Sequence, residues 1–180
     1  MSCPPPARYG GGVREVEVLG VRVEMPTNSP IVLLREREGG RRYLPIWIGA
    51  PEAAAITYAQ QGVVPPRPLT HDLLRDVLTT LGHELTEVRI VALKDSVFHA
   101  TLVIDGQTEI SARPSDAIAL ALRTGSKVLV ESSILDEAAI VVSSDEDDEV
   151  EKFKEFLDHV SAEDFESPEG SGPGSESQES

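Results

Sequence analysis

The sequence predicts an α+β fold, in which a mixed or antiparallel sheet is backed by about three helices in a single domain. Two observations lead to this prediction. Short apolar runs with strand-like alternation recur along residues 13–142, and helical segments interrupt them first as a pair and then singly. The chain of 180 residues is long enough to bury a core in one domain and to carry a tail.

Residues 13–48 are expected to form three strands. Valines alternate with charged residues over 13–25 in two runs, and the break at Leu19-Gly20 predicts a bulge or bend. Residues 31–37 and 42–48 form the next two strands, joined by a turn at Gly39-Gly40. Pro45 in the returning strand indicates an edge or a bulge, because proline cannot donate to the hydrogen-bond ladder.

Helices and strands then alternate less regularly. Two helices are expected at about 51–61 and 69–81, joined by the linker VVPPR. After them the sequence predicts strands at 83–95, 96–105 and 107–111, a helix over 114–124, a strand at 127–132 and a short helix near 133–139 that leads to AIVV. We expect the apolar faces of the three longer helices to be buried. Ile118 and Leu122 should point into the core or a subunit interface.

The three longer helices share the way they begin. Each has a proline and then an acidic residue in or near its first turn, and two carry an arginine just before the proline, as RPLTHD at 67–72 and RPSD at 113–116. Proline suits this turn because its missing N–H is not needed there, and an acid complements the helix dipole. Thr70 and Ser115 are expected to cap the free N–H groups. These local roles require no function.

The same helix openings are the candidate functional site. If they converge at one edge of the sheet, they bring together carboxylates, an imidazole, hydroxyls and arginines: Glu52, Arg67, Thr70, His71, Asp72, Arg113, Ser115 and Asp116. Carboxylates with an imidazole can hold Mg²⁺ or Mn²⁺. A metal with a bound water can attack a phosphodiester, and arginine can stabilise the developing charge.

Signatures of several other function classes are missing from the sequence. It contains no G-x-x-x-x-G-K-[ST], H-E-x-x-H, C-x-x-C or G-x-S-x-G pattern.

A hairpin with four arginines (Arg35, Arg37, Arg41 and Arg42) is a second candidate surface for nucleic acid, although edge strands also carry charges to prevent aggregation.

The charge of the chain is unevenly spread. Residues 143–180 hold 14 acidic residues and two lysines, so they carry −12 of the formal net charge of −15. An acidic tail is expected to repel nucleic acid, to maintain solubility or to bind a basic protein partner. We read 1–12 as a flexible leader, 13–142 as the domain, and 143–180 as an acidic linker, a short amphipathic helix at 149–160 and a disordered tail.

Cysteine content and hydropathy indicate the compartment. The one cysteine, Cys3, fits a reducing cytosol, and no run approaches the roughly 20 apolar residues of a membrane span. We therefore expect a soluble cytoplasmic protein without membrane contact.

Residues 117–123 are apolar nearly all round their helix, which indicates burial on more than one side and predicts a homo-oligomer, a dimer or larger.

Three motifs carry a resemblance to a known family. LPIWIGAPEAAAI (44–56), RPLTHDLL (67–74) and ARPSDAIALALR (112–123), in this order and spacing, resemble the bifunctional nuclease domain family over roughly residues 13–142. FKEFLDHVSAEDF (153–165) resembles the C-terminal extension of its bacterial members. The resemblance implies an α+β fold, an oligomeric assembly and degradation of DNA and RNA, and it places the motif positions at the eight candidate residues named above.

Two hypotheses for the function follow. In the first, the protein is a metal-dependent nuclease: Asp72, Asp116 and Glu52 bind the metal, and His71 acts as a ligand or general base. The substrate is then held by Arg67, Arg113, Thr70 and Ser115. In the second, it is a non-catalytic oligomeric binding or regulatory module, whose helix N-termini are structural or bind a small anion. The domain charge of −3 over residues 1–142 favours the second, because a nuclease usually presents a basic groove.

Overall fold

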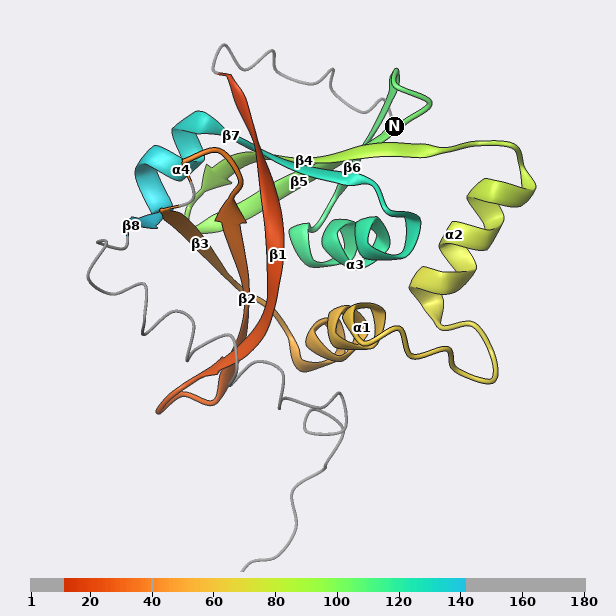
Figure 1. The fold of residues 1–180 in the computed structure, drawn as a ribbon, viewed down its shortest axis with the longest axis horizontal. Coiled ribbons are helices and arrows are strands. Elements are labelled where there is room, and N and C mark those ends of the chain that lie inside the picture. The colour runs from red at the N-terminus through yellow and green to blue at the C-terminus, as the bar shows by residue number, and fades with distance from the viewer. Residues whose placement is uncertain (1–11, 40, 142–180) are drawn as a thin grey trace, which may run out of the picture.

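The computed structural model describes residues 12–39 and 41–141, which form one eight-stranded sheet and four helices (Figure 1). The strands are β1 (Val13–Glu24), β2 (Ser29–Glu36), β3 (Arg42–Trp47), β4 (Leu85–Lys94), β5 (Val97–Ile104), β6 (Thr108–Ala112), β7 (Lys127–Glu131) and β8 (Ile140–Val141). The helices are α1 (Ala50–Gln60), α2 (Thr70–Thr80), α3 (Pro114–Thr124) and α4 (Ser132–Ala138). The predicted α+β class is confirmed, and every predicted strand and helix of this range is present.

The sheet is mixed, as expected. Its strand order is β6-β5-β4-β7-β1-β2-β3-β8. All neighbouring strands are antiparallel except β4 and β7, which run parallel. Strand β7 therefore joins an N-terminal meander to a central meander, and α3 crosses from the outer strand β6 back to β7.

Two irregularities in the strands have the causes that the sequence indicated. The register between β1 and β2 shifts between Val18 and Gly20, so the predicted bulge is confirmed. Pro45 pairs with Leu33 of β2, while β8 pairs with β3 only at Arg42 and Tyr43. The outer side of β3 is thus open at Pro45, where no donor is needed.

Helices α1 and α3 cover the inner face of the twisted sheet. Helix α1 packs on β1 and β2, whereas α3 packs on β4, β5 and β7, and the two helices contact each other (Figure 1). The buried stretches are Ala53–Thr57 of α1 and, on α3, residues 114, 115 and 117–121. Ile118 is fully buried and Leu122 packs against the core, as predicted. The small alanines allow both helices to lie close to the sheet and to each other.

Helix α2 lies outside this arrangement, and here one expectation is wrong. None of its residues is buried, and its main helix neighbour is α3 (Figure 1). Leu73, Leu74 and Val77 are exposed, with Leu73 at 54%. The predicted burial of its apolar face fails within this chain because α1 and α3 already fill the inner face of the sheet. Helix α2 therefore packs mainly on the outer side of α3, where its half-buried Leu78 contacts the core.

The helix ends agree with the predictions to within one residue, but their caps differ. The N-cap residues are Gly49, Leu69 and Arg113, and none caps its helix with a side chain. Thr70 and Ser115 lie inside the first turn instead, so their predicted capping role is wrong. In α2 the orphan donor is satisfied from inside, because the Leu69 N–H donates to Asp72 Oδ2 at 3.0 Å. Gly125 adopts a left-handed conformation and terminates α3 as expected.

Two regions of the sequence analysis lie outside the described residues. They are the predicted leader, apart from Gly12, and the predicted tail with its helix at 149–160. The proposed domain boundaries thus remain predictions. No helix among the described residues is long and apolar enough to cross a membrane.

Candidate active site

The N-termini of α1, α2 and α3 meet, and Arg113 and Asp116 at the start of α3 join them. Its Nη2 lies 3.0 Å from Glu52 Oε1 on α1, and its Nε donates to Asp116 Oδ2 at 2.8 Å. Asp116 Oδ1 in turn lies 3.3 Å from Nε2 of His71 on α2. The structure therefore brings four predicted residues together, and we call Glu52, His71, Arg113 and Asp116 the helix-opening cluster.

The ionisation of this cluster follows from its contacts. Partial burial disfavours the charged form of Asp116, but hydrogen bonds from Arg113 and His71 outweigh it and lower the pKa of this carboxyl. The hydrogen bond to Asp116 and the neighbouring charge of Glu52 raise the pKa of Arg113. The contacts thus favour the charged forms of Asp116 and Arg113, and the guanidinium of Arg113 lies on the solvent side at 67% exposure.

Glu52 reaches Arg113 because of the glycine before its helix. A Cβ on Gly49 would lie 2.3 Å from Glu52 Oε2, so the carboxylate folds back over the backbone where only glycine leaves room. Gly49 has an ordinary φ of −79°, and its role is close approach, since its backbone conformation needs no glycine. This contribution was absent from the sequence analysis.

His71 is positioned by Asp116 and keeps one ring nitrogen available. Its side chain is mostly buried, and its Nε2 faces Asp116. No hydrogen bond to Nδ1 is found within residues 12–39 and 41–141. A carboxylate on one nitrogen orients the ring and fixes its tautomer.

Asp72 belongs to a different contact from the one that the sequence suggested. Its Oδ1 accepts from Arg123 Nε at 2.5 Å, and its Oδ2 accepts from the Leu69 N–H. Burial raises its pKa, but the hydrogen bonds from Arg123 and Leu69 more than compensate and lower it overall. Both oxygens of Asp72 are therefore engaged away from Asp116.

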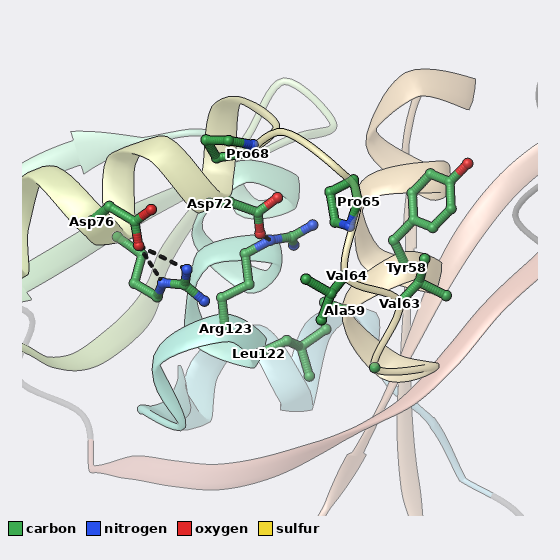
Figure 2. Close-up of a pocket in the computed structure, with 12 residues that line it drawn as sticks. Tyr58, Ala59, Val63, Val64, Pro65, Pro68, Asp72, Asp76, Leu122 and Arg123 are labelled. Carbon is green, nitrogen blue, oxygen red and sulfur yellow. Dashed lines mark hydrogen bonds and ion pairs between the residues drawn. The ribbon is translucent and has the colours of Figure 1, made fainter.

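The Asp72–Arg123 pair forms the base of a pocket of about 350 Å³ between α2 and the loop that follows α1 (Figure 2). Figure 2 shows Leu122 and the loop residues Val63, Val64 and Pro65 around it. Arg123 also donates to the carbonyls of Ala55 and Ala119, so it ties all three helices together. Sequence reasoning missed Arg123. The available signal was a single arginine at the end of the apolar run of residues 117–122.

The remaining predicted residues occupy separate positions. Arg67 is exposed and makes no ion pair with the part of the chain described. Thr70 lies beside the helix-opening cluster and lines its pocket. Ser115 is buried and faces a neighbouring pocket. Three of the four arginines of the hairpin are paired, because Arg35, Arg37 and Arg42 each contact a glutamate.

Two adjoining pockets flank the cluster. One, of about 540 Å³, is lined by all four cluster residues. The other, of about 300 Å³, is lined by Trp47, Val97 and Ser115 and shares Glu52 and Arg113 with the first. The Glu52–Arg113 ion pair thus lies where the two pockets meet.

The described residues do not present a ready metal centre. Within them, no three or more His, Cys, Asp or Glu side chains are grouped closely enough to hold a metal ion. Asp72 is engaged by Arg123, and the guanidinium of Arg113 bonds to both Glu52 and Asp116. As arranged, this donor set does not fit the Mg²⁺ or Mn²⁺ site that was expected from Glu52, Asp72 and Asp116.

The fold and the site together define a class: an α+β domain in which converging helix N-termini bring carboxylates, an imidazole and a guanidinium together. The chain belongs to the bifunctional nuclease domain family, because residues 32–143 match the family model of the bifunctional nuclease domain. All eight predicted site residues lie within the matched range.

Two relatives come from Mycobacterium tuberculosis. They are the uncharacterized protein MT1877 of strain CDC 1551 / Oshkosh and the uncharacterized protein Rv1829 of strain ATCC 25618 / H37Rv. Each is 55% identical over 160 residues, which covers 84% of this chain and 97% of the relative. The similarity thus extends over nearly the whole relative.

Proposed function

We propose that this protein is a nuclease that hydrolyses phosphodiester bonds of DNA or RNA at the helix-opening cluster. The observation that supports it is the His71–Asp116–Arg113 arrangement: an imidazole oriented by a carboxylate beside an exposed guanidinium. These are a proton acceptor and an anion-binding group on the border of a 540 Å³ pocket. The family match supports the substrate class.

The chemistry assigned to each group follows from its contacts. His71 Nδ1 accepts a proton from a water molecule as the water oxygen forms a bond to phosphorus, and the leaving oxygen takes a proton from solvent. Asp116 stabilises the imidazolium that results. Arg113 donates to the phosphoryl oxygens, where negative charge builds up in the transition state. Glu52 holds the guanidinium in place from the other side.

No step is assigned to a metal ion, because the donors do not fit one as arranged. Whether cleavage requires Mg²⁺ or Mn²⁺ is decided by adding each ion, or a chelator, to the assay. Asp72 receives a structural role in this proposal, since both of its oxygens hold the start of α2 in place.

The test is cleavage of end-labelled single-stranded DNA and RNA by highly purified protein. We expect His71→Ala and Asp116→Ala each to reduce cleavage by 10²-fold or more, the size usual for loss of acid–base catalysis. The matched control is His83→Ala, because His83 Nδ1 pairs with Asp105 at 2.7 Å outside both pockets. Cleavage that persists at the wild-type rate in both cluster variants would mark a contaminating enzyme and overturn the proposal.

A second candidate function is a non-catalytic oligomeric module that binds a partner. The exposed apolar face of α2 favours it, as does the neutralisation of Arg113 by two carboxylates. This function predicts self-association and binding without turnover. The same cleavage assay separates the two candidates, because only the first predicts a loss of product with His71→Ala.

A further inference from the structure

We infer that Trp47 is a stacking platform for one unpaired base of a single-stranded nucleic acid, next to the helix-opening cluster. This inference rests on the proposed function for the class of substrate and extends it to the strandedness of that substrate. Trp47 ends β3, directly before the residues that start α1. It is the one tryptophan of the chain, and it is 55% exposed.

The indole is held in place although it is exposed. Its Nε1 donates to Glu24 Oε2 at 2.9 Å, which links the end of β3 to the end of β1. An exposed aromatic ring that is fixed by its polar edge presents its face to a ligand without a further loss of rotamer freedom. A tryptophan that only filled space would instead be covered by neighbouring side chains.

The pocket next to Trp47 has the size and lining that suit a single ring system. Its volume of about 300 Å³ is at the lower end of the range for ligand sites. Val97 and Phe98 supply apolar surface, while Ser96 and Ser115 supply hydroxyls. The buried Ser115 has no side-chain hydrogen bond to the described residues, so its hydroxyl is available to the edge of a base.

The hairpin turn at the edge of this pocket is short and tight. Asp95 and Ser96 both have positive φ angles, 50° and 62°, in the two-residue connection from β4 to β5. Such a tight turn fits the twist of a hairpin and leaves little freedom to the residues that it joins. Ser96 and Val97 are thus presented at the pocket from a short, defined loop.

The position of Arg113 selects nucleic acid over a purely apolar ligand. Arg113 lines both pockets, so it can bind the phosphate of a nucleotide whose base stacks on Trp47. Base stacking on an aromatic ring next to an arginine is the usual mode of single-strand binding. In a duplex the faces of the bases are covered by their neighbours, so the platform has nothing to stack on.

The single tryptophan makes this inference directly measurable by fluorescence. The full-length protein, kept in a chelator, is titrated with a ten-residue oligothymidylate, with the same oligomer paired to its complement, and with a ten-residue abasic oligomer. We expect saturable quenching by the oligothymidylate alone. Equal quenching by the abasic oligomer, or binding of the oligothymidylate by anisotropy without any quenching, would overturn the inference.

Variants provide a second measurement that does not depend on tryptophan emission. Binding of a fluorescein-labelled oligothymidylate should weaken by roughly 5- to 150-fold in Trp47→Ala, the range for loss of one stacked base, and only slightly in Trp47→Phe. Val64→Ala is the control, since Val64 is exposed but lies outside this pocket. Light scattering could instead show that Trp47→Ala dissociates an assembly of protein subunits while the variant still binds oligothymidylate with the wild-type affinity. In that case Trp47 is a subunit contact and the inference is wrong.

These outcomes separate the inference from the proposed nuclease. Quenching and its loss in Trp47→Ala, without cleavage under any metal condition, would retain the stacking site and reject the nuclease. Cleavage of single strands by Trp47→Ala with the wild-type KM and kcat would reject the stacking site and retain the nuclease. No binding of any oligonucleotide, together with no cleavage under any metal condition, would reject both.

Discussion

Arg123, in the last turn of α3, donates to Asp72, in the first turn of α2, across 2.5 Å (Figure 2). The two side chains are largely buried, at 5% and 14% exposure, and Arg123 also bonds to carbonyls of α1 and α3. This ion pair holds α2 against the rest of the domain, although α2 has no buried residue of its own. It therefore determines where His71, the neighbour of Asp72, is placed.

Asp72 and Asp116 should consequently behave differently when they are replaced. We expect Asp72→Ala to lower the free energy of unfolding by about 3 kcal/mol, because it leaves a buried guanidinium without its partner. Asp116→Ala should cost only about 1 kcal/mol, as is usual for a residue at a helix start, yet it should reduce cleavage by 10²-fold or more. Urea denaturation of each variant measures the difference.

The control for this comparison is Asp76→Ala. Asp76 pairs with its own neighbour in α2, Arg75. These two side chains are 41% and 48% exposed, so their ion pair should be worth less than about 1 kcal/mol. If Asp72→Ala were no more destabilising than Asp76→Ala, the structural role of the Asp72–Arg123 pair would be wrong.

The same pair predicts how stability depends on acid. The contacts of Asp72 lower its pKa below the ordinary value of 3.8, so the unfolded chain binds a proton more readily than the folded one. Its stabilising contribution is fully present above that ordinary pKa and is lost as the pH falls through the lower folded value. Asp72→Asn should therefore differ most from the wild type near neutral pH, and the difference should shrink below pH 4. Thermal unfolding over this range provides the measurement.

Gly49→Ala should damage the site while sparing the fold. The new Cβ would meet the end of the flexible Glu52 side chain, which can swing away at little cost. Its contact with Arg113 would then be lost, so we expect weaker cleavage with an unfolding free energy within about 0.5 kcal/mol of the wild type. Gly39→Ala is a useful comparison, since Gly39 has a positive φ of 91° and open space around it. That variant should lose stability and keep its activity.

Glu131 should oppose folding at neutral pH. It is buried at the end of β7, its Oε2 has no hydrogen-bond partner within the described chain, and burial raises its pKa above the ordinary 4.5. Stability is then greatest below that ordinary value and decreases as the pH rises through the folded pKa. Glu131→Gln removes this loss, so its melting temperature should exceed that of the wild type at pH 7 and approach it at pH 4. A lower melting temperature at both values would contradict this account.

The exposed leucines and valine of α2 predict self-association. Leu73, Leu74 and Val77 form an apolar surface that a monomer would leave in water, together with Leu81 beyond the helix end. We expect Leu73→Glu with Val77→Glu to convert an oligomer to a monomer in light scattering. Met25→Glu, at a turn where the side chain is still more exposed, is the control. A wild-type chain that is already monomeric at micromolar concentration would remove this prediction.

The sequence by itself determined the elements of this domain and much of the site. Strand alternation, proline at helix starts and glycine at helix ends are local signals, and they located the bulge at Leu19, the open edge at Pro45 and the boundaries of the three longer helices. The repeated Arg-Pro openings also indicated where polar residues would gather, and Glu52, His71, Arg113 and Asp116 do meet.

Only the tertiary structure decided which of those residues face one another. His71 and Asp72 are adjacent in sequence, but successive residues of a helix point about 100° apart, so one reaches Asp116 and the other Arg123. The partner of Asp72, Arg123, lies 51 residues away at the end of an apolar run, and no local signal in the sequence connects the two residues. The tertiary structure also decided that α2 has no buried residue. The amphipathic pattern of a helix indicates that it has an apolar face, but it does not indicate which surface covers that face.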